Sequence, residues 1–105
     1  MQRIGFRLKV RPEKLEEYKA AHRNVWPEML DALRRTGWHN YSLFLDLDGT
    51  LFGYVETPDF EQAIAGMAKE PVNARWQTAM KPLFEALGGN PDEEMRALEQ
   101  VFFLE

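Results

Sequence analysis

Residues 3–10 alternate strictly between apolar side chains and Arg, Gly or Lys. This period of two predicts a β-strand with one face in the core and the other turned outward. Pro12 follows almost at once, and proline favours the first position of a helix. The chain therefore opens with a half-buried strand joined directly to a helix.

The helix that follows is predicted from a second periodicity. Apolar residues recur at steps of three and four between Leu15 and Leu33, which predicts an amphipathic helix of about six turns. Gly37 is expected to end it in a left-handed conformation. Pro27 lies inside this pattern. Because proline lacks a backbone N–H and clashes with the preceding turn, we expect a kink there.

The rest of the chain continues this mixture of strands and helices. Asp48-Gly49 predicts a hairpin turn between the second and third strands. Proline-led segments with helical periodicity predict two more helices, and a Gly-Gly-Asn-Pro run predicts a loop after them. The expected strands cover 38–46, 51–56 and 98–104, the expected helices 58–69 and 71–87, and the loop 88–91.

The resulting order, β-α-β-β-α-(α)-β, predicts an α+β fold of the ferredoxin-like split βαβ kind. It would form a four-stranded antiparallel sheet with helices on one face, in a single domain of residues 1–105. The other face of the sheet needs a cover as well. We expect a second copy of the chain to supply it, which gives a homodimeric α+β barrel.

Composition narrows the range of partners. The net charge is −4, which argues against nucleic acid or an anionic membrane as the main partner. No apolar run approaches the roughly 20 residues that span a bilayer, and no secretory signal is visible. The chain has no cysteine, which excludes thiolate catalysis and fits a reducing compartment. We therefore expect a cytoplasmic protein.

Tyr18 and His22 are the best indication of function, because they occupy core-facing positions of the first predicted helix. Four residues apart, they project into the same space. One interpretation is a buried histidine whose ring is bonded to a carbonyl and packed against a tyrosine. The other is a general acid or base in a small pocket, since imidazole exchanges protons near neutral pH.

Aromatic side chains elsewhere favour a sugar as the ligand. Trp26, Trp38, Tyr41 and Trp76 all lie on predicted element faces, where such residues usually form the core. Tryptophan and tyrosine also offer flat apolar surfaces with one polar group, which suit the C–H faces and hydroxyls of a sugar. Gln77 places an amide, both donor and acceptor, beside Trp76.

Metal and phosphate chemistry find less support. Residues 44–51 resemble the first motif of haloacid-dehalogenase-type phosphatases, in which Asp46 would be the nucleophile. Strand residues resume directly after Gly49, however, so we interpret the segment as a hairpin. His22 and His39 do not have the spacing of paired zinc ligands on a helix, and no metal site is expected.

The chain as a whole resembles the L-rhamnose mutarotase family. Short motifs in the family's order support this along nearly the full length: Glu17-Tyr18, His22, Val25-Trp26-Pro27-Glu28, His39-Asn40-Tyr41, Leu45-Asp46, Ala74-Arg75-Trp76 and Leu98-Glu99-Gln100-Val101-Phe102. The resemblance implies a homodimeric cytoplasmic isomerase, without a cofactor, that interconverts the α and β anomers of L-rhamnose. It further implies that His22 is the proton donor and that Tyr18, Tyr41 and Trp76 contact the sugar. Some members have a second Trp where this chain has Gln77.

Mutarotation opens the pyranose ring and closes it again, so it needs an acid at the ring oxygen and a base at the anomeric hydroxyl. We expect His22 to be the acid. The sequence does not identify the base, and Tyr18, a carboxylate or water could serve. An apolar wall from Trp76 or Trp26 would accept the methyl group of rhamnose. Two other functions stay open: a small dimeric α+β barrel monooxygenase or haem-binding relative, and a sugar-binding module without catalysis.

Overall fold

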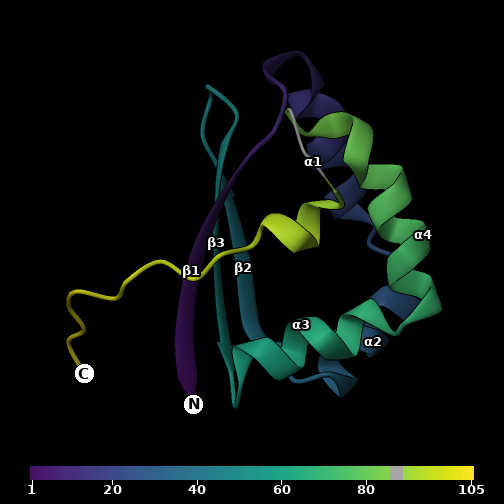
Figure 1. Ribbon diagram of the computed structural model, residues 1–105. Helices are drawn as coiled ribbons and strands as arrows, with labels where there is room; N and C mark the ends of the chain where they lie inside the picture. Colours follow the sequence, from purple (N-terminus) through teal and green to yellow (C-terminus); the bar gives the residue numbers. More distant parts are fainter. Residues whose placement is uncertain (86–88) are drawn as a thin grey trace.

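The centre of the molecule is an antiparallel sheet of three strands in the order β1-β3-β2 (Figure 1). The computed structural model describes residues 1–85 and 89–105, in which β1 covers Gln2–Lys9, β2 His39–Leu45 and β3 Thr50–Thr57. In the turn between β2 and β3, the Gly49 N–H donates to the Asp46 carbonyl at 3.0 Å, and Gly49 has a φ of +93°. The predicted hairpin at Asp48-Gly49 is therefore confirmed.

The helices pack on one face of this sheet, which confirms the predicted α+β class and one-sided helix layer (Figure 1). They are α1 (Leu15–Arg23), α2 (Pro27–Arg35), α3 (Phe60–Ala68) and α4 (Pro71–Met80), with the short 3-10 turns η1 (Pro12–Lys14), η2 (Lys81–Leu83) and η3 (Pro91–Glu94). No helix in the described ranges is long and apolar enough to cross a bilayer. The helical end predicted at Leu87 and the loop start at Gly88 lie outside the described residues.

The single long helix expected over Leu15–Leu33 is two helices, so the prediction of a mere kink was wrong. Trp26 has an extended ψ of 132°, and Pro27 begins α2. The residue before a proline is forced out of helical geometry, and here the whole turn between the helices is lost. The end of α2 is as predicted: Gly37 has a φ of +95°, and the Trp38 N–H bonds to the Leu33 carbonyl at 3.0 Å.

The fourth strand predicted over 98–104 does not form, so the sheet has three strands and not four. The Leu98 N–H donates to the Gly5 carbonyl on β1 at 2.7 Å, but the chain then leaves the edge of the sheet (Figure 1). Val101 and Leu104 are 86% and 79% exposed. An apolar run predicts burial against some surface, but in this single chain most of the run stays exposed.

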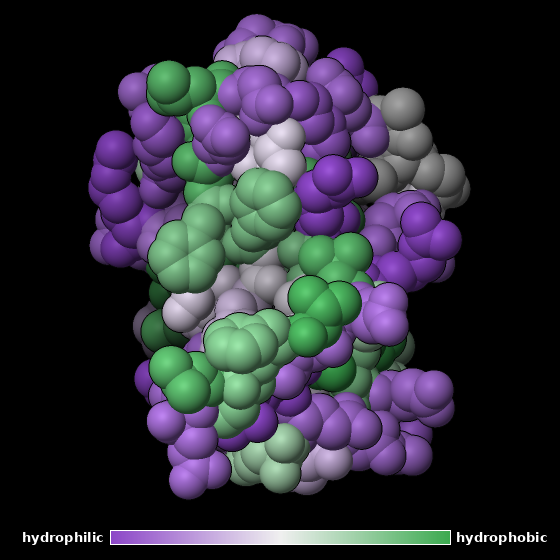
Figure 2. All heavy atoms as spheres, turned by 90° about the vertical axis from the view of Figure 1, so that its left-hand side faces the viewer, coloured by the Kyte–Doolittle hydropathy of each residue, from purple (hydrophilic) through white to green (hydrophobic). Residues whose placement is uncertain are grey.

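The face of the sheet opposite the helices is exposed and partly apolar. Phe44 of β2 and Phe52 of β3 are 63% and 46% exposed there. Phe103 of the C-terminal segment contacts β1. The centroid of its ring lies 3.6 Å from the Arg3 guanidinium carbon. Figure 2 views this side and shows apolar side chains gathered across its middle with hydrophilic ones around them.

The face of the sheet that is covered by the helices holds the core. Phe6 and Val10 are fully buried and Leu8 is 7% exposed, which confirms the alternation read from the first strand. Phe6 pairs with Gly53 of β3, and its ring occupies the space where a side chain of residue 53 would stand. Glycine at position 53 therefore lets the Phe6 ring lie flat on the sheet, under the helices.

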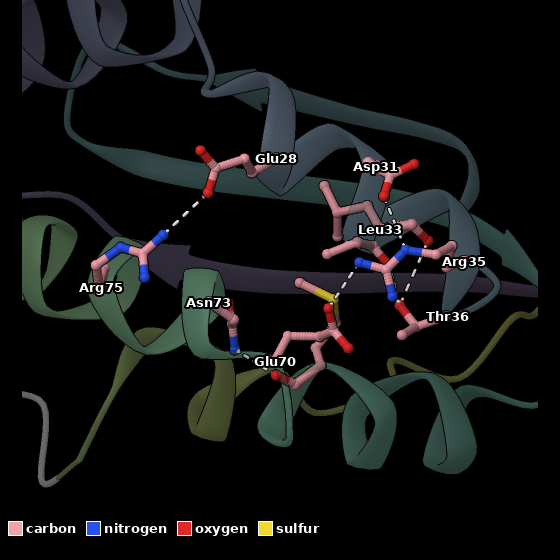
Figure 3. A network of polar contacts seen from close by, with 10 residues as sticks. Glu28, Asp31, Leu33, Arg35, Thr36, Glu70, Asn73 and Arg75 are labelled. Atoms are coloured by element: carbon pink, nitrogen blue, oxygen red, sulfur yellow. Dashed lines mark hydrogen bonds and ion pairs between the residues drawn. The ribbon is translucent and has the colours of Figure 1, made fainter.

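Polar contacts link α2 to α4 along their solvent-facing sides (Figure 3). Arg35 of α2 contacts Asp31 of its own helix and Glu70 at the start of α4, each at 2.8 Å. Arg75 of α4 contacts Glu28 of α2 at 3.1 Å. Exposed pairs of this kind contribute little stability each.

Gly53→Ala should destabilise the protein by about 1–3 kcal/mol, because the new methyl group overlaps the Phe6 ring. An ideal Cβ at residue 53 would lie 2.1 Å from the Phe6 Cζ atom. Urea unfolding followed by circular dichroism measures the loss. In the double variant Phe6→Leu/Gly53→Ala, the smaller side chain makes room, so the combined loss should be less than the sum of the two single losses. Strict additivity would contradict this packing.

Candidate active site

A cavity of about 350 Å³ lies between the inner face of the sheet and the helices. Its volume is in the range of small-molecule sites. Apolar side chains of the sheet and of α2 form much of its lining: Leu8, Leu43, Leu51, Met29, Leu30 and Leu33. The rest of the lining adds aromatic and polar side chains from α1, β2, α4 and the segment that includes η3, together with further apolar side chains such as Met67 and Met80.

His22 is half-buried in the last turn of α1 and lines the cavity. Its Nδ1 lies 2.9 Å from the Tyr18 carbonyl oxygen. A carbonyl only accepts, so Nδ1 holds the proton and Nε2 is the nitrogen left for a ligand. Burial lowers the pKa of His22, and the Tyr18 hydrogen bond opposes this in part. The imidazole is thus oriented by its own helix and gives up its second proton readily.

Tyr18 lies one turn earlier on α1 and is almost fully buried. Its ring centroid is 4.2 Å from that of His22 and 5.7 Å from that of Phe84, which it meets edge to face. Burial raises the pKa of Tyr18, with a smaller contribution from Tyr41. The hydroxyl therefore keeps its proton at neutral pH and is available as a donor to a ligand in the cavity.

Trp76 of α4 closes the other side of His22, with ring centroids 5.4 Å apart and planes at 85°. Trp26, in the break between α1 and α2, stands edge to face on Trp76 at 5.0 Å. The two indoles make a rigid apolar corner next to the imidazole. Of these two indoles, Trp76 lines the cavity and Trp26 does not. Trp26 therefore supports the position of Trp76.

Tyr41 reaches the cavity from β2, where its ring packs 5.0 Å from that of Trp38. Burial raises the pKa of Tyr41, and the nearby negative charge of Asp92 raises it further. Tyr41 thus adds a second neutral hydroxyl to the cavity wall. Asp92 lines the same cavity as Tyr41.

Three further polar residues line the cavity: Asn73 and Gln77 of α4, and Asp92 of η3. The Gln77 amide donates to Asn73 Oδ1 at 3.0 Å, and Asn73 Nδ2 donates to Asp92 Oδ2 at 2.9 Å. Sequence reasoning noted Gln77 but missed Asn73 and Asp92. Asp92 follows Pro91 at the start of a helical turn, where an acidic residue is common for reasons of helix capping alone.

The residues singled out in the sequence thus fall into two groups. His22, Tyr18, Tyr41 and Trp76 all line one cavity. The phosphatase-like motif is a hairpin turn, as interpreted: the Asp46 carbonyl accepts from Gly49, and Asp48 Oδ1 accepts from the Thr50 N–H.

His39 is exposed at the start of β2 and lies outside the cavity lining. Within the described ranges, no three His, Asp or Glu side chains are grouped to hold a metal ion.

Comparison with known proteins agrees with the resemblance seen in the sequence. A family model for L-rhamnose mutarotase matches residues 3–104. The L-rhamnose mutarotase of Bacillus subtilis is 41% identical over 108 residues that cover 100% of both chains. That of Oceanobacillus iheyensis is 43% identical over 86 residues, which cover 81% of this chain and 82% of the relative.

Solved structures show the same relationship. The crystal structure of an L-rhamnose mutarotase from Formosa agariphila superposes with a TM-score of 0.80, at 27% identity and with full coverage of both chains. Rv0793 from Mycobacterium tuberculosis shares the fold alone, with a TM-score of 0.60 at 12% identity over 98% of this chain and 97% of its own. The match to the family model over nearly the whole chain, supported by these relatives, shows that the chain belongs to the L-rhamnose mutarotase family of isomerases.

Proposed function

We propose that the cavity interconverts the α and β anomers of L-rhamnose by opening and closing the pyranose ring. The observation that most directly supports this is the imidazole of His22, whose Nδ1 is engaged by the Tyr18 carbonyl. Its Nε2 is then free to exchange a proton with a sugar held between aromatic rings. Membership of the mutarotase family supplies the substrate class.

His22 is the general acid of this reaction. As imidazolium it gives the Nε2 proton to the ring oxygen while the bond from that oxygen to the anomeric carbon breaks, and it takes the proton back on closure. A lowered pKa favours this role, because the proton leaves readily. Tyr18 and Tyr41, kept neutral by burial, donate hydrogen bonds to sugar hydroxyls.

Trp76 contacts an apolar part of the sugar. Together with Met29, Leu30 and Leu33 of α2 it gives the cavity an apolar surface on which the methyl group of rhamnose packs. A hexose with a hydroxymethyl group at that carbon would leave a hydroxyl without a partner there, which disfavours its binding. A cytoplasmic location and a reaction without a cofactor belong to the same proposal.

The protein acts as a homodimer, an α+β barrel in which a second copy covers the exposed face of the sheet. Phe44 and Phe52 on that face, together with the apolar C-terminal segment, support this assignment. Apolar side chains gathered on one exposed face are typical of an interaction surface.

His22→Ala should lower the catalysed anomer exchange by about 10²–10⁴-fold while the fold is kept, since the general acid is lost. Saturation-transfer proton NMR between the two anomeric protons of equilibrated L-rhamnose measures the exchange rate. His39→Ala is the matched control, because His39 lies outside the cavity lining, and it should keep the wild-type rate. A His22→Ala protein that exchanges the anomers normally would contradict the assignment.

The exchange rate at low sugar concentration should fall as the pH rises through the pKa of His22. The imidazolium is the proton donor, and burial places its pKa below the ordinary imidazole value of about 6.5. The decline should therefore be centred on the acid side of about 6.5. The same NMR measurement across pH, corrected for uncatalysed exchange, gives the profile. A rate that rises through this range would instead make neutral His22 a base.

Light scattering should give a mass twice the chain mass of 12.3 kDa. Phe44→Glu places a charge on the proposed interface and should yield the single-chain mass. Leu47→Glu is its control, because Leu47 is an equally apolar, 87% exposed side chain in the hairpin turn. A wild-type protein with the mass of one chain would overturn the dimer.

A further inference from the structure

The proposed reaction needs a base as well as an acid, and η3 brings a carboxylate to the cavity. Asp92 is half-buried there, while its neighbours Glu93 and Glu94 are exposed. In Figure 1 this short turn lies between the sheet and α4, inside the helix layer. A carboxylate in such a place loses hydration and needs partners or a task.

The partners of Asp92 are amides rather than cations. Among the described residues no Lys, Arg or His lies within ion-pair distance of it. Its backbone N–H donates to Gln77 Oε1 at 3.2 Å, and its Oδ2 accepts from Asn73 Nδ2 at 2.9 Å. The Asp92 carboxylate is therefore oriented by neutral groups and is not paired with a cation in the described part of the chain.

The amides are themselves fixed. Asn73 Nδ2 also donates to the Met67 carbonyl at 3.1 Å, and Asn73 Oδ1 accepts from Gln77 Nε2 at 3.0 Å. In the described part of the chain, one hydrogen bond reaches the Asp92 carboxylate, and Oδ2 accepts it. Oδ1 is thus left for a ligand. A carboxylate held in one orientation by its neighbours is what proton transfer to a small substrate requires.

His22, Tyr18, Tyr41 and Asp92 all line one cavity. The ring centroids of Tyr18 and His22 lie 4.2 Å apart, and burial keeps both tyrosine hydroxyls neutral. A sugar in this cavity therefore meets an imidazole, two neutral hydroxyls and a carboxylate.

We propose that Asp92 is the general base of the mutarotase reaction, an assignment that rests on the function proposed above. Asp92 Oδ1 takes the proton of the anomeric hydroxyl as that oxygen becomes the aldehyde carbonyl. The bond between the anomeric carbon and the ring oxygen breaks, and the ring oxygen receives the His22 proton. On closure each proton returns, after attack on the other face of the aldehyde, so nothing is consumed. Asn73 and Gln77 are positioning residues for Asp92.

Asp92→Asn tests the assignment, because it keeps the shape and the oxygen that accepts from Asn73 but removes the basicity. Anomer exchange by NMR should fall by about 10²–10⁴-fold. L-rhamnose affinity, measured by calorimetry on the same sample, should stay within a few-fold. Glu94→Gln is the matched control, since Glu94 is an exposed carboxylate of the same turn, and it should keep wild-type exchange.

A second variant covers the case in which Asp92→Asn does not fold. Asp92→Ala leaves space for a small carboxylate, and added formate should restore exchange beyond its effect on wild type and on sugar alone. Normal anomer exchange by Asp92→Asn would overturn the base role. So would a loss of sugar binding in parallel with the loss of exchange. The role would also be overturned if formate did not restore exchange by Asp92→Ala. Failure of wild type itself to exchange the anomers would overturn the proposed function and this inference together.

Discussion

The break that Pro27 imposes between α1 and α2 is the constraint on which the site depends. A straight helix over the whole apolar pattern would be about 30 Å long and could present only one line of side chains to the sheet. Two shorter helices can present different side chains to the cavity. α1 presents Tyr18 and His22 to the cavity, while α2 forms an apolar wall and pairs with α4. Trp26 lies in the break itself and supports Trp76 from behind.

A second consequence of this arrangement is electrostatic. The polar groups that line the cavity are mostly neutral: two tyrosine hydroxyls and two amides, with one imidazole and one carboxylate. Burial disfavours charge on His22 and on both tyrosines. A reaction that moves protons between a sugar and two side chains, with no net change of charge, is well matched to such surroundings.

Much of this could be predicted from the sequence because the signals were local. Alternation placed Phe6 and Leu8 in the core, Asp48-Gly49 set the hairpin, and the four-residue spacing of Tyr18 and His22 put both side chains in one place. The prediction of a final strand over 98–104 was wrong, because an apolar run does not indicate which surface will cover it.

Asn73 and Asp92 were missed for a different reason. They are 19 residues apart and meet only through the fold. Each also has an ordinary local explanation, one inside a helix and one at the start of a turn. Neither residue shows its partner in the sequence, whereas Tyr18 and His22 do, because one turn of helix brings them together.

We expect the sugar to bind with its anomeric carbon between His22 and Asp92. A crystal structure of the protein with L-rhamnose bound tests this most directly. The expected result is electron density for the sugar in this cavity, with the ring oxygen within hydrogen-bond distance of His22 Nε2 and the anomeric hydroxyl directed at Asp92 Oδ1. A sugar bound elsewhere, or in the cavity with its anomeric carbon turned away from both residues, would contradict it.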